Sequence, residues 1–137
     1  GEPLRALREV GSGGELSRIM LAIKTVLADT DAIPTLIFDE IDTAISGRTA
    51  EKVGEKLQKI AAKHQVILIT HLPQIAAKAD RHFLIEKNVV DGKTKTEIHA
   101  LSEEESVKEL ARLLGGTELT EEALQNARSL KKKAERK

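Results

Sequence analysis

Two short apolar runs, separated by a helical segment, constrain the fold of this chain more than any other feature. Residues 35–38 and 65–70 are mainly apolar without strict alternation, a pattern typical of strands buried on both faces. The segment between them, residues 48–63, carries apolar side chains at helical spacing: Ala50, Val53, Leu57, Ile60 and Ala61. A right-handed crossover through this helix makes the two strands parallel neighbours.

The sequence after the second strand predicts a β-hairpin. A short helix at 73–79 leads to an apolar strand at 82–87, and residues 88–93 have the composition of a turn. Residues 94–101 alternate enough to pair back as an antiparallel strand.

Two helices are expected to follow the hairpin. Ser102 and Glu105 have the spacing of a capping box, and Gly115-Gly116 end the helix that they begin. Its expected inward stripe is Val107, Leu110, Leu113 and Leu114. Thr120 can cap a last helix, which ends in a basic tail at 128–137 with little surface left to bury. The expected fold class is therefore α/β, with a short, mostly parallel sheet, flanking helices, a β-hairpin and C-terminal helices.

The composition excludes several classes of function. Among 137 residues, Lys and Arg together number 22, as do Asp and Glu, so no overall field draws the chain to nucleic acid or to a membrane surface. Without cysteine there are no disulfides, thiolate metal sites or thiol nucleophiles, which fits a cytoplasmic protein. The four histidines lack the i, i+4 spacing of a zinc motif, and without Trp or Tyr there is no aromatic platform for single-stranded nucleic acid. No membrane partner is expected.

The segment 12–18 predicts a capped helix that could hold an anion. Ser12 and Glu15 have capping-box spacing, and Gly13 and Gly14 lack the Cβ atoms that would keep a phosphate from the main chain. The apolar residues that follow at helical spacing are Leu16, Ile19, Met20, Ile23, Val26 and Leu27. From the cap alone a well-capped core helix is the better interpretation, because capping boxes are more common than phosphate sites.

Polar residues follow both predicted parallel strands. Asp39 and Glu40 end the first strand and His71 ends the second, so all three are expected at the carboxyl edge of the sheet, where α/β proteins bind ligands. With a magnesium nucleotide, the first carboxylate could hold the metal, the second could polarise water, and the histidine could donate to a phosphate oxygen. Taken singly, such residues are more often helix caps or loop residues. Their order and spacing favour the nucleotide interpretation.

These stretches resemble the motifs of ATP-binding-cassette ATPases. Residues 12–18 resemble the signature motif, 36–40 the Walker B strand and 43–47 the D-loop, and His71 resembles the switch histidine. The residues within these motifs are similar to those of the SMC-related branch of these ATPases, which acts in bacterial DNA double-strand-break repair and recombination. The resemblance covers nearly the whole chain. It implies that residues 11–137 form the C-terminal lobe of an ABC-type P-loop NTPase head and that residues 1–10 lead in from a coiled coil.

The resemblance also implies roles for individual residues. Asp39 would hold Mg²⁺, and Glu40 and His71 would be catalytic, Glu40 as base or water orienter and His71 as sensor of the γ-phosphate. The residues implied to bind ATP are Ser12, Gly13, Gly14, Glu15, Ser46 and Gly47. The implied partners are an N-terminal P-loop lobe of the same protein, a second head in a homodimer whose ATP is contacted in trans, and DNA through the complete protein. The implied location is the bacterial cytoplasm, at the nucleoid.

The phosphate-cradling P-loop itself is expected in the other lobe. The only Gly-Lys-Thr is Gly92-Lys93-Thr94, and Lys87 stands where the motif requires its first glycine. We therefore expect no strong ATP binding and no activity from this chain alone. Gly11 and Ser46 stand where many ABC proteins have Leu and Asp, and Ala44, in place of an expected glycine, should stiffen the D-loop.

Two other interpretations remain open from the sequence. In the first, residues 106–128 form a helix-turn-helix module and Lys131, Lys132 and Lys133 grip nucleic-acid phosphates. In the second, the chain is a structural fragment whose unpaired sheet edge invites self-association until another lobe completes it.

Overall fold

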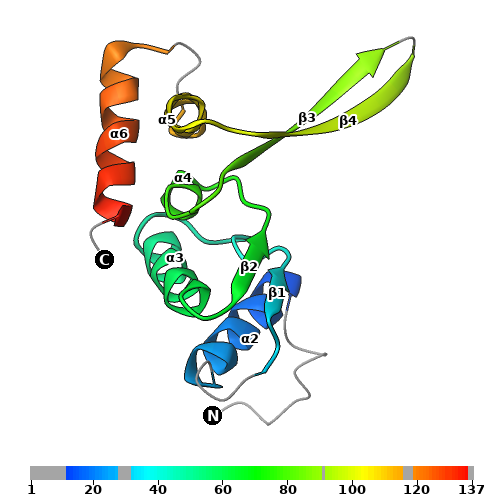
Figure 1. Ribbon diagram of the computed structural model, residues 1–137, viewed down its shortest axis with the longest axis vertical. Coiled ribbons are helices and arrows are strands. Elements are labelled where there is room, and N and C mark those ends of the chain that lie inside the picture. The colour runs from blue at the N-terminus through cyan, green and yellow to red at the C-terminus, as the bar shows by residue number, and fades with distance from the viewer. Residues whose placement is uncertain (1–11, 28–31, 91, 116–118, 136–137) are drawn as a thin grey trace. The chain divides into compact units, whose positions relative to one another are not determined.

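The computed structural model describes residues 12–27, 32–90, 92–115 and 119–135, and the chain divides into two compact units, Gly1–Ile75 and Ala76–Lys137. Figure 1 shows the elements of both. The expected lead-in segment 1–10, Gly11 and Gly116 lie outside the described residues. The fold is mixed α/β, with a short parallel sheet and an antiparallel hairpin, which confirms the expected class.

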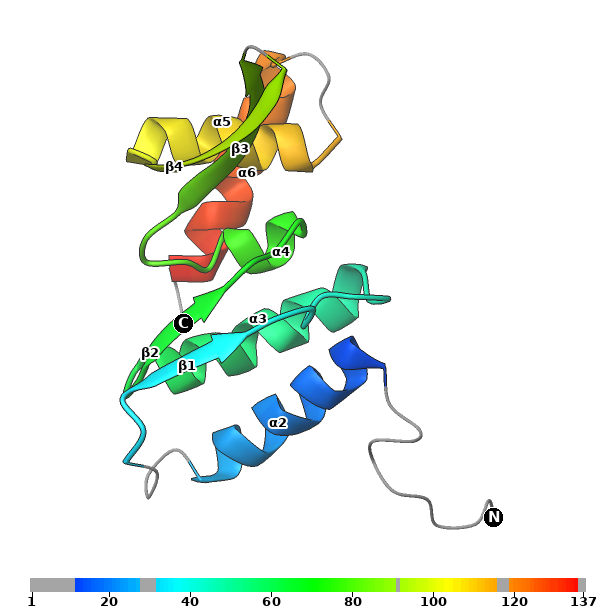
Figure 2. The ribbon, with the colours of Figure 1, turned by 90° about the vertical axis from the view of Figure 1, so that its right-hand side faces the viewer.

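The first unit contains the predicted strand, helix and strand. Strands β1 (Thr35–Phe38) and β2 (Gln65–Leu68) pair in parallel, with Thr35 opposite Gln65 and Phe38 opposite Leu68. Helix α3 (Gly47–Ala61) connects them and runs beside them in Figure 2. Its buried face is the one that periodicity predicts, with Ala61 half-buried at its end: Ala50, Val53, Gly54, Leu57 and Ile60.

Burial of the strands on both faces was a wrong expectation. Leu36 and Phe38 are buried against α2 (Gly13–Leu27) and α3, whereas Ile37 on the opposite face of β1 is 75% exposed. Ile67 and Ile69 are also exposed. The reason is that α2 and α3 contribute to a single core on one face, and no described element of this unit covers the other.

Helix α2 is present as predicted, but its apolar stripe is not buried. Its buried residues are Gly14 and Leu21, while the expected stripe is exposed, most strongly at Val26, which is 82% exposed. Helical periodicity identified an apolar face correctly, but the sheet and α3 contact α2 through Leu21 instead.

The second unit consists of the hairpin and the two C-terminal helices. Strands β3 (Phe83–Val90) and β4 (Lys93–Ala100) pair antiparallel, and the hairpin is longer than expected because β3 continues into the segment predicted as turn. Helix α4 (Pro73–Ala76) is shorter than the predicted 73–79. Ala76 and Ala77, which end and follow it, pack with helices α5 (Glu103–Leu113) and α6 (Glu121–Glu135) in a small core.

Both helix caps of this unit are confirmed. The Ser102 hydroxyl accepts from the Glu105 N–H, and the Glu105 carboxylate accepts from the Ser102 N–H. These bonds lower the pKa of Glu105 below its ordinary value, and the bond from the Ser102 backbone N–H has the largest effect. The Ala123 N–H donates to Thr120 Oγ1 over 3.2 Å at the start of α6.

The basic tail is more structured than the sequence suggested. It continues α6 to Glu135, buries Ala134 and places Lys131 with its side chain only 13% exposed. The expectation of little left to bury was wrong because Leu130 and the small residue Ala134 of the tail both pack in the core of this unit. Across the described part of the chain, no helix combines the length and apolarity that crossing a bilayer requires.

Candidate functional site

The carboxyl edge of the parallel sheet gathers the acidic pair that the sequence singled out. Asp39 and Glu40 follow β1 directly, and both side chains are exposed. The Glu40 N–H donates to Asp39 Oδ1 over 2.9 Å, and Glu40 itself has a positive φ of 53°. A left-handed backbone is uncommon for a residue other than glycine and tends to occur at functional sites.

The start of α2 lies against Glu40. Ser12 and Glu15 form the predicted capping box, with the Ser12 N–H donating to Glu15 Oε2 over 2.8 Å. A Cβ atom on Gly13 would lie 3.2 Å from Glu40 Cδ, and one on Gly14 would lie 2.7 Å from the Glu40 carbonyl oxygen. The open space that the two glycines were expected to offer a phosphate is thus lined by Glu40 of the same chain.

Two polar side chains of α2 hold the loop that follows β1. Ser17 Oγ donates to the Asp39 carbonyl over 2.6 Å. Arg18 Nη1 donates to the carbonyls of Ile41 and Thr43 over 3.2 and 2.8 Å. These bonds fix the main chain on either side of Glu40. No role was expected for Ser17 or Arg18 individually, although both lie within the signature-like segment.

The histidine after β2 is joined to the same loop. The Asp42 carboxylate is buried, and its Oδ2 lies 3.0 Å from His71 Nδ1. Thr70 Oγ1 and the His71 N–H also donate to this oxygen, over 2.7 and 3.0 Å. The loop after β1 and the residue after β2 therefore form one connected edge. Asp42 was missed by sequence reasoning.

The residues that resemble a D-loop lie farther along this loop. Ser46 has an extended backbone and precedes α3, with its carbonyl accepting from the Thr49 N–H over 3.2 Å. Gly47 has a positive φ of 51° and an open environment, and both residues are exposed. Ala44 also has a positive φ, of 58°. A left-handed backbone explains why glycine would suit position 44 better than alanine.

The acidic pair fits a magnesium ion only in part. Carboxylate oxygens are the ligands that Mg²⁺ takes from proteins, and Asp39 supplies one exposed carboxylate. Among the described residues, no group of three or more His, Cys, Asp or Glu side chains could form a complete metal cage. A Mg²⁺ ion bound through Asp39 would have to take its remaining ligands from phosphates and water.

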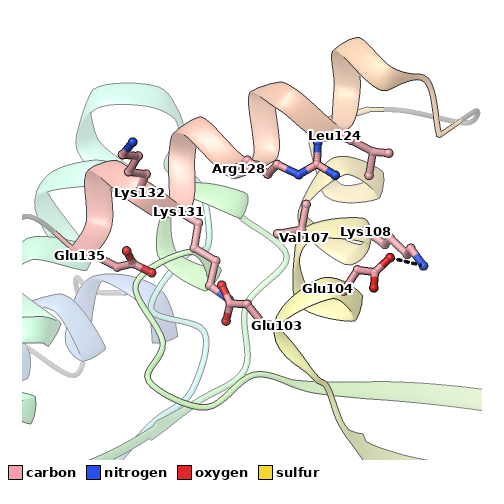
Figure 3. A pocket seen from close by; sticks show the side chains of 9 residues that line it. All are labelled: Glu103, Glu104, Val107, Lys108, Leu124, Arg128, Lys131, Lys132 and Glu135. Carbon is pink, nitrogen blue, oxygen red and sulfur yellow. Dashed lines mark hydrogen bonds and ion pairs between the residues drawn. The ribbon is translucent and has the colours of Figure 1, made fainter.

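A separate groove of about 520 Å³ lies between α5 and α6 in the second unit. Figure 3 shows two apolar side chains, Val107 and Leu124, among the acidic and basic side chains that line it. Lys131, expected in a phosphate-gripping tail, donates to Glu103 Oε2 over 2.7 Å and to Ser106 Oγ over 3.1 Å. Its partners are therefore internal. The mixed charge of the groove does not suit a polyanion.

No family model matches the chain. Among curated proteins, it is 47% identical over 135 residues to DNA repair protein RecN of Bacillus subtilis, a match covering 98% of this chain. It is 52% identical over 130 residues to DNA repair protein RecN of Haemophilus influenzae, with 95% of this chain covered. The chain belongs to the RecN family. It spans 23% of the length of these RecN proteins.

The fold also has a solved neighbour. An SMC ATPase structure, from work on ATP-driven dimerization and DNA-stimulated activation of SMC ATPases, matches with a TM-score of 0.55 and 24% identity. The match covers 86% of this chain and 70% of that one. At this identity the likeness concerns the fold, which is that of an SMC-type head lobe, and it agrees with the RecN assignment.

Proposed function

We propose that this chain is the signature-bearing lobe of a RecN-type ATPase head and that it acts on ATP and Mg²⁺ together with a P-loop lobe. The observation that carries the proposal is the shared edge: Asp39 and Glu40 end one parallel strand, His71 follows the next, and the start of α2 packs on Glu40. Hydrolysis of a magnesium nucleotide needs carboxylate, phosphate-binding and water-orienting groups close together, as they would be at one edge of this sheet.

In this proposal each residue has a limited task. Asp39 provides the metal-binding carboxylate, and Glu40 orients the attacking water and takes its proton. His71 contacts the γ-phosphate. A Mg²⁺ ion, when bound, would offset negative charge on the phosphates. Ser17 and Arg18 hold the loop so that Asp39 and Glu40 need little rearrangement during turnover.

The second set of proposed contacts is made in trans. Ser12, Gly13, Gly14 and Glu15, with Ser46 and Gly47 on the D-loop, would face ATP held by the opposite head of a homodimer. The exposed, capped start of α2 supports this, because the N-terminus of a helix favours a negative charge. The complete protein would couple this association to work on broken DNA in the bacterial cytoplasm and nucleoid.

The proposed cis partner is the N-terminal P-loop lobe. The uncovered face of the sheet, with Ile37, Ile67 and Ile69, and the exposed stripe of α2 are apolar surfaces that a second lobe would bury. In the part of the chain that the structure describes, both strands of the sheet are edges, so a further strand could pair with either one. The Gly92-Lys93-Thr94 triplet lies at the hairpin, where β4 begins, and does not resemble a P-loop.

The test is ATP binding by this chain with and without a separately supplied P-loop lobe. We expect binding only in the mixture, and Asp39→Asn should weaken its Mg²⁺ dependence. Asp80→Asn, which changes an exposed carboxylate of the other unit, serves as the control and should bind normally. Tight binding by the chain alone, or none in a mixture that forms a stable complex, would contradict the proposal.

A further inference from the structure

The geometry points to Asp42 as a positioning residue that holds the His71 ring with its proton on Nδ1 and its Nε2 turned outward. The His71 side chain is 73% exposed, whereas the Asp42 side chain behind it is only 7% exposed. A ring with so much solvent around it would ordinarily sample several rotamers. The buried carboxylate is the feature that selects one of them.

The hydrogen bonds at Asp42 fix both the main chain and the side chain of the histidine. Oδ2 accepts from the His71 backbone N–H over 3.0 Å and lies 3.0 Å from Nδ1 of the same residue. Thr70 Oγ1 donates to this oxygen over 2.7 Å and itself accepts from the Leu72 N–H over 3.1 Å. Residues 70–72 are thus hydrogen-bonded, directly or through Thr70 Oγ1, to the buried carboxylate of Asp42.

The chemistry of the acceptor decides the tautomer. A carboxylate oxygen only accepts hydrogen bonds, so the ring nitrogen that faces it must carry the proton. The hydrogen bond made by one nitrogen of a histidine sets the state of the other. Among the residues that the structure describes, Nε2 has no hydrogen-bond partner, so it is the nitrogen available to a ligand.

This inference rests on the proposed function where it concerns ATP, because it assigns Asp42 the task of aiming the residue that would meet the γ-phosphate. The carboxylate itself is buried and acts through His71. Asp42 also lies on the loop that Arg18 holds at Ile41 and Thr43. The position of the His71 ring is thereby tied to the loop that carries Glu40.

The first experiment measures the tautomer directly in the 137-residue chain. Long-range ¹⁵N–¹H spectra, recorded where imidazoles are neutral, should show the Nδ1–H form for His71. His64 is an internal reference, because its Nδ1 lies 2.7 Å from the Ile33 carbonyl oxygen, which also only accepts. In Asp42→Ala the His71 signals should change toward the Nε2–H form, while those of His64 stay unchanged.

Two further variants separate positioning from folding. Asp42→Asn keeps an acceptor oxygen and should retain most of the Nδ1–H form, which gives a readout that survives if Asp42→Ala fails to fold. Glu51→Gln changes an exposed carboxylate on α3 and should leave the His71 signals unchanged. A wild-type His71 that is mainly Nε2–H, or a folded Asp42→Ala with unchanged signals, would overturn the inference.

The second experiment measures turnover in the mixture with the P-loop lobe. Asp42→Ala should lower kcat by about 10-fold to 100-fold, the usual effect of removing a group that orients a functional histidine. The KM for ATP should change by less than about threefold, and Asp42→Asn should recover part of the rate. Full turnover by Asp42→Ala would show that the orientation of His71 by Asp42 does not matter for ATP hydrolysis. If the wild-type mixture hydrolyses no ATP, the proposed function fails, and the spectra still decide whether Asp42 orients His71.

Discussion

The carboxylate of Glu40 packs directly against the main chain of Gly13. A Cβ atom at Gly13 would meet only the flexible end of the glutamate, Oε2 and Cδ, whereas one at Gly14 would meet the Glu40 backbone oxygen at 2.7 Å and Thr43 Cβ at 3.0 Å. The two adjacent glycines therefore perform different tasks. Gly13 makes room for a side chain that can move, and Gly14 makes room for a main chain that cannot move without shifting the loop.

The first prediction compares alanine at these two positions. Gly14→Ala should lower the free energy of unfolding by about 1–3 kcal/mol, because relief of the clash requires a backbone shift. Gly13→Ala should leave stability nearly unchanged, since Glu40 can swing aside and alanine favours the helix. Urea unfolding of both variants checks this. Equal losses at the two positions would contradict the different packing of Glu40 against Gly13 and Gly14.

The second prediction concerns Glu40 in the proposed ATPase. In the mixture with a P-loop lobe, Glu40→Gln should lower turnover by about 10²- to 10⁴-fold, because the amide cannot take a proton from water. ATP-dependent association should persist, since the shape of the side chain is kept. Steady-state hydrolysis and light scattering measure the two effects, with Glu51→Gln on the exposed side of α3 as control. Normal hydrolysis by Glu40→Gln would show that Glu40 does not take the proton from the attacking water.

Local sequence patterns predicted the elements of this fold and much of one buried face. The inward residues of α3 follow from helical spacing, and the parallel pairing of β1 with β2 follows from the crossover between them. The capping boxes at Ser12 and Ser102 follow from a three-residue spacing. In each case the interacting groups lie close in sequence or share one period.

What the sequence could not supply is which surface covers an apolar face. The stripe of α2 and the outer face of β1 are as apolar as predicted, but burial depends on a partner surface that periodicity does not identify. The same limit explains the misjudged tail, where the small residue Ala134 is buried by close helix packing.

Long-range hydrogen bonds were likewise hidden from local patterns. Arg18 reaches the Thr43 carbonyl across 25 residues of sequence, and Asp42 accepts from the His71 N–H across 29. Each partner is an ordinary polar residue in its own segment. Only the fold brings them together, so the support of the candidate site emerged from the structure, whereas Asp39, Glu40 and His71 themselves were recognisable from their places after the strands.

The third prediction tests the left-handed backbone of Ala44, whose φ is 58°. This conformation costs a residue with a Cβ atom about 1–2 kcal/mol. Glycine avoids that cost but loses about 0.4–1 kcal/mol through the greater freedom of the unfolded chain. Ala44→Gly should therefore raise the free energy of unfolding, by up to about 1.6 kcal/mol.

A matched control for this change is Ala62, which follows α3 with an ordinary helical φ of −64°. Ala62→Gly should destabilise the chain, because glycine there gains nothing in the folded state. Urea midpoints of the two variants should consequently move in opposite directions. A loss of stability in Ala44→Gly would show that contacts of the loop around Ala44 outweigh its backbone preference.

The fourth prediction concerns His82, whose Nδ1 lies 2.9 Å from Ser106 Oγ at the base of the hairpin. Burial lowers the pKa of His82 below its ordinary value of 6.5, with Glu109 opposing this shift and Lys131 adding to it. The unfolded chain consequently binds a proton at this histidine more readily than the folded chain does. The contribution of the uncharged, buried His82 to the free energy of unfolding is therefore fully present above pH 6.5. It is lost as the pH falls below that value.

Urea midpoints measured from about pH 7.5 to about pH 5.5 should decrease on the acidic side, and His82→Gln should flatten this part of the profile. The glutamine can keep a hydrogen bond to Ser106 without titrating. If His82→Gln keeps the wild-type slope, the acid sensitivity of this unit arises elsewhere, and burial of His82 contributes little to it.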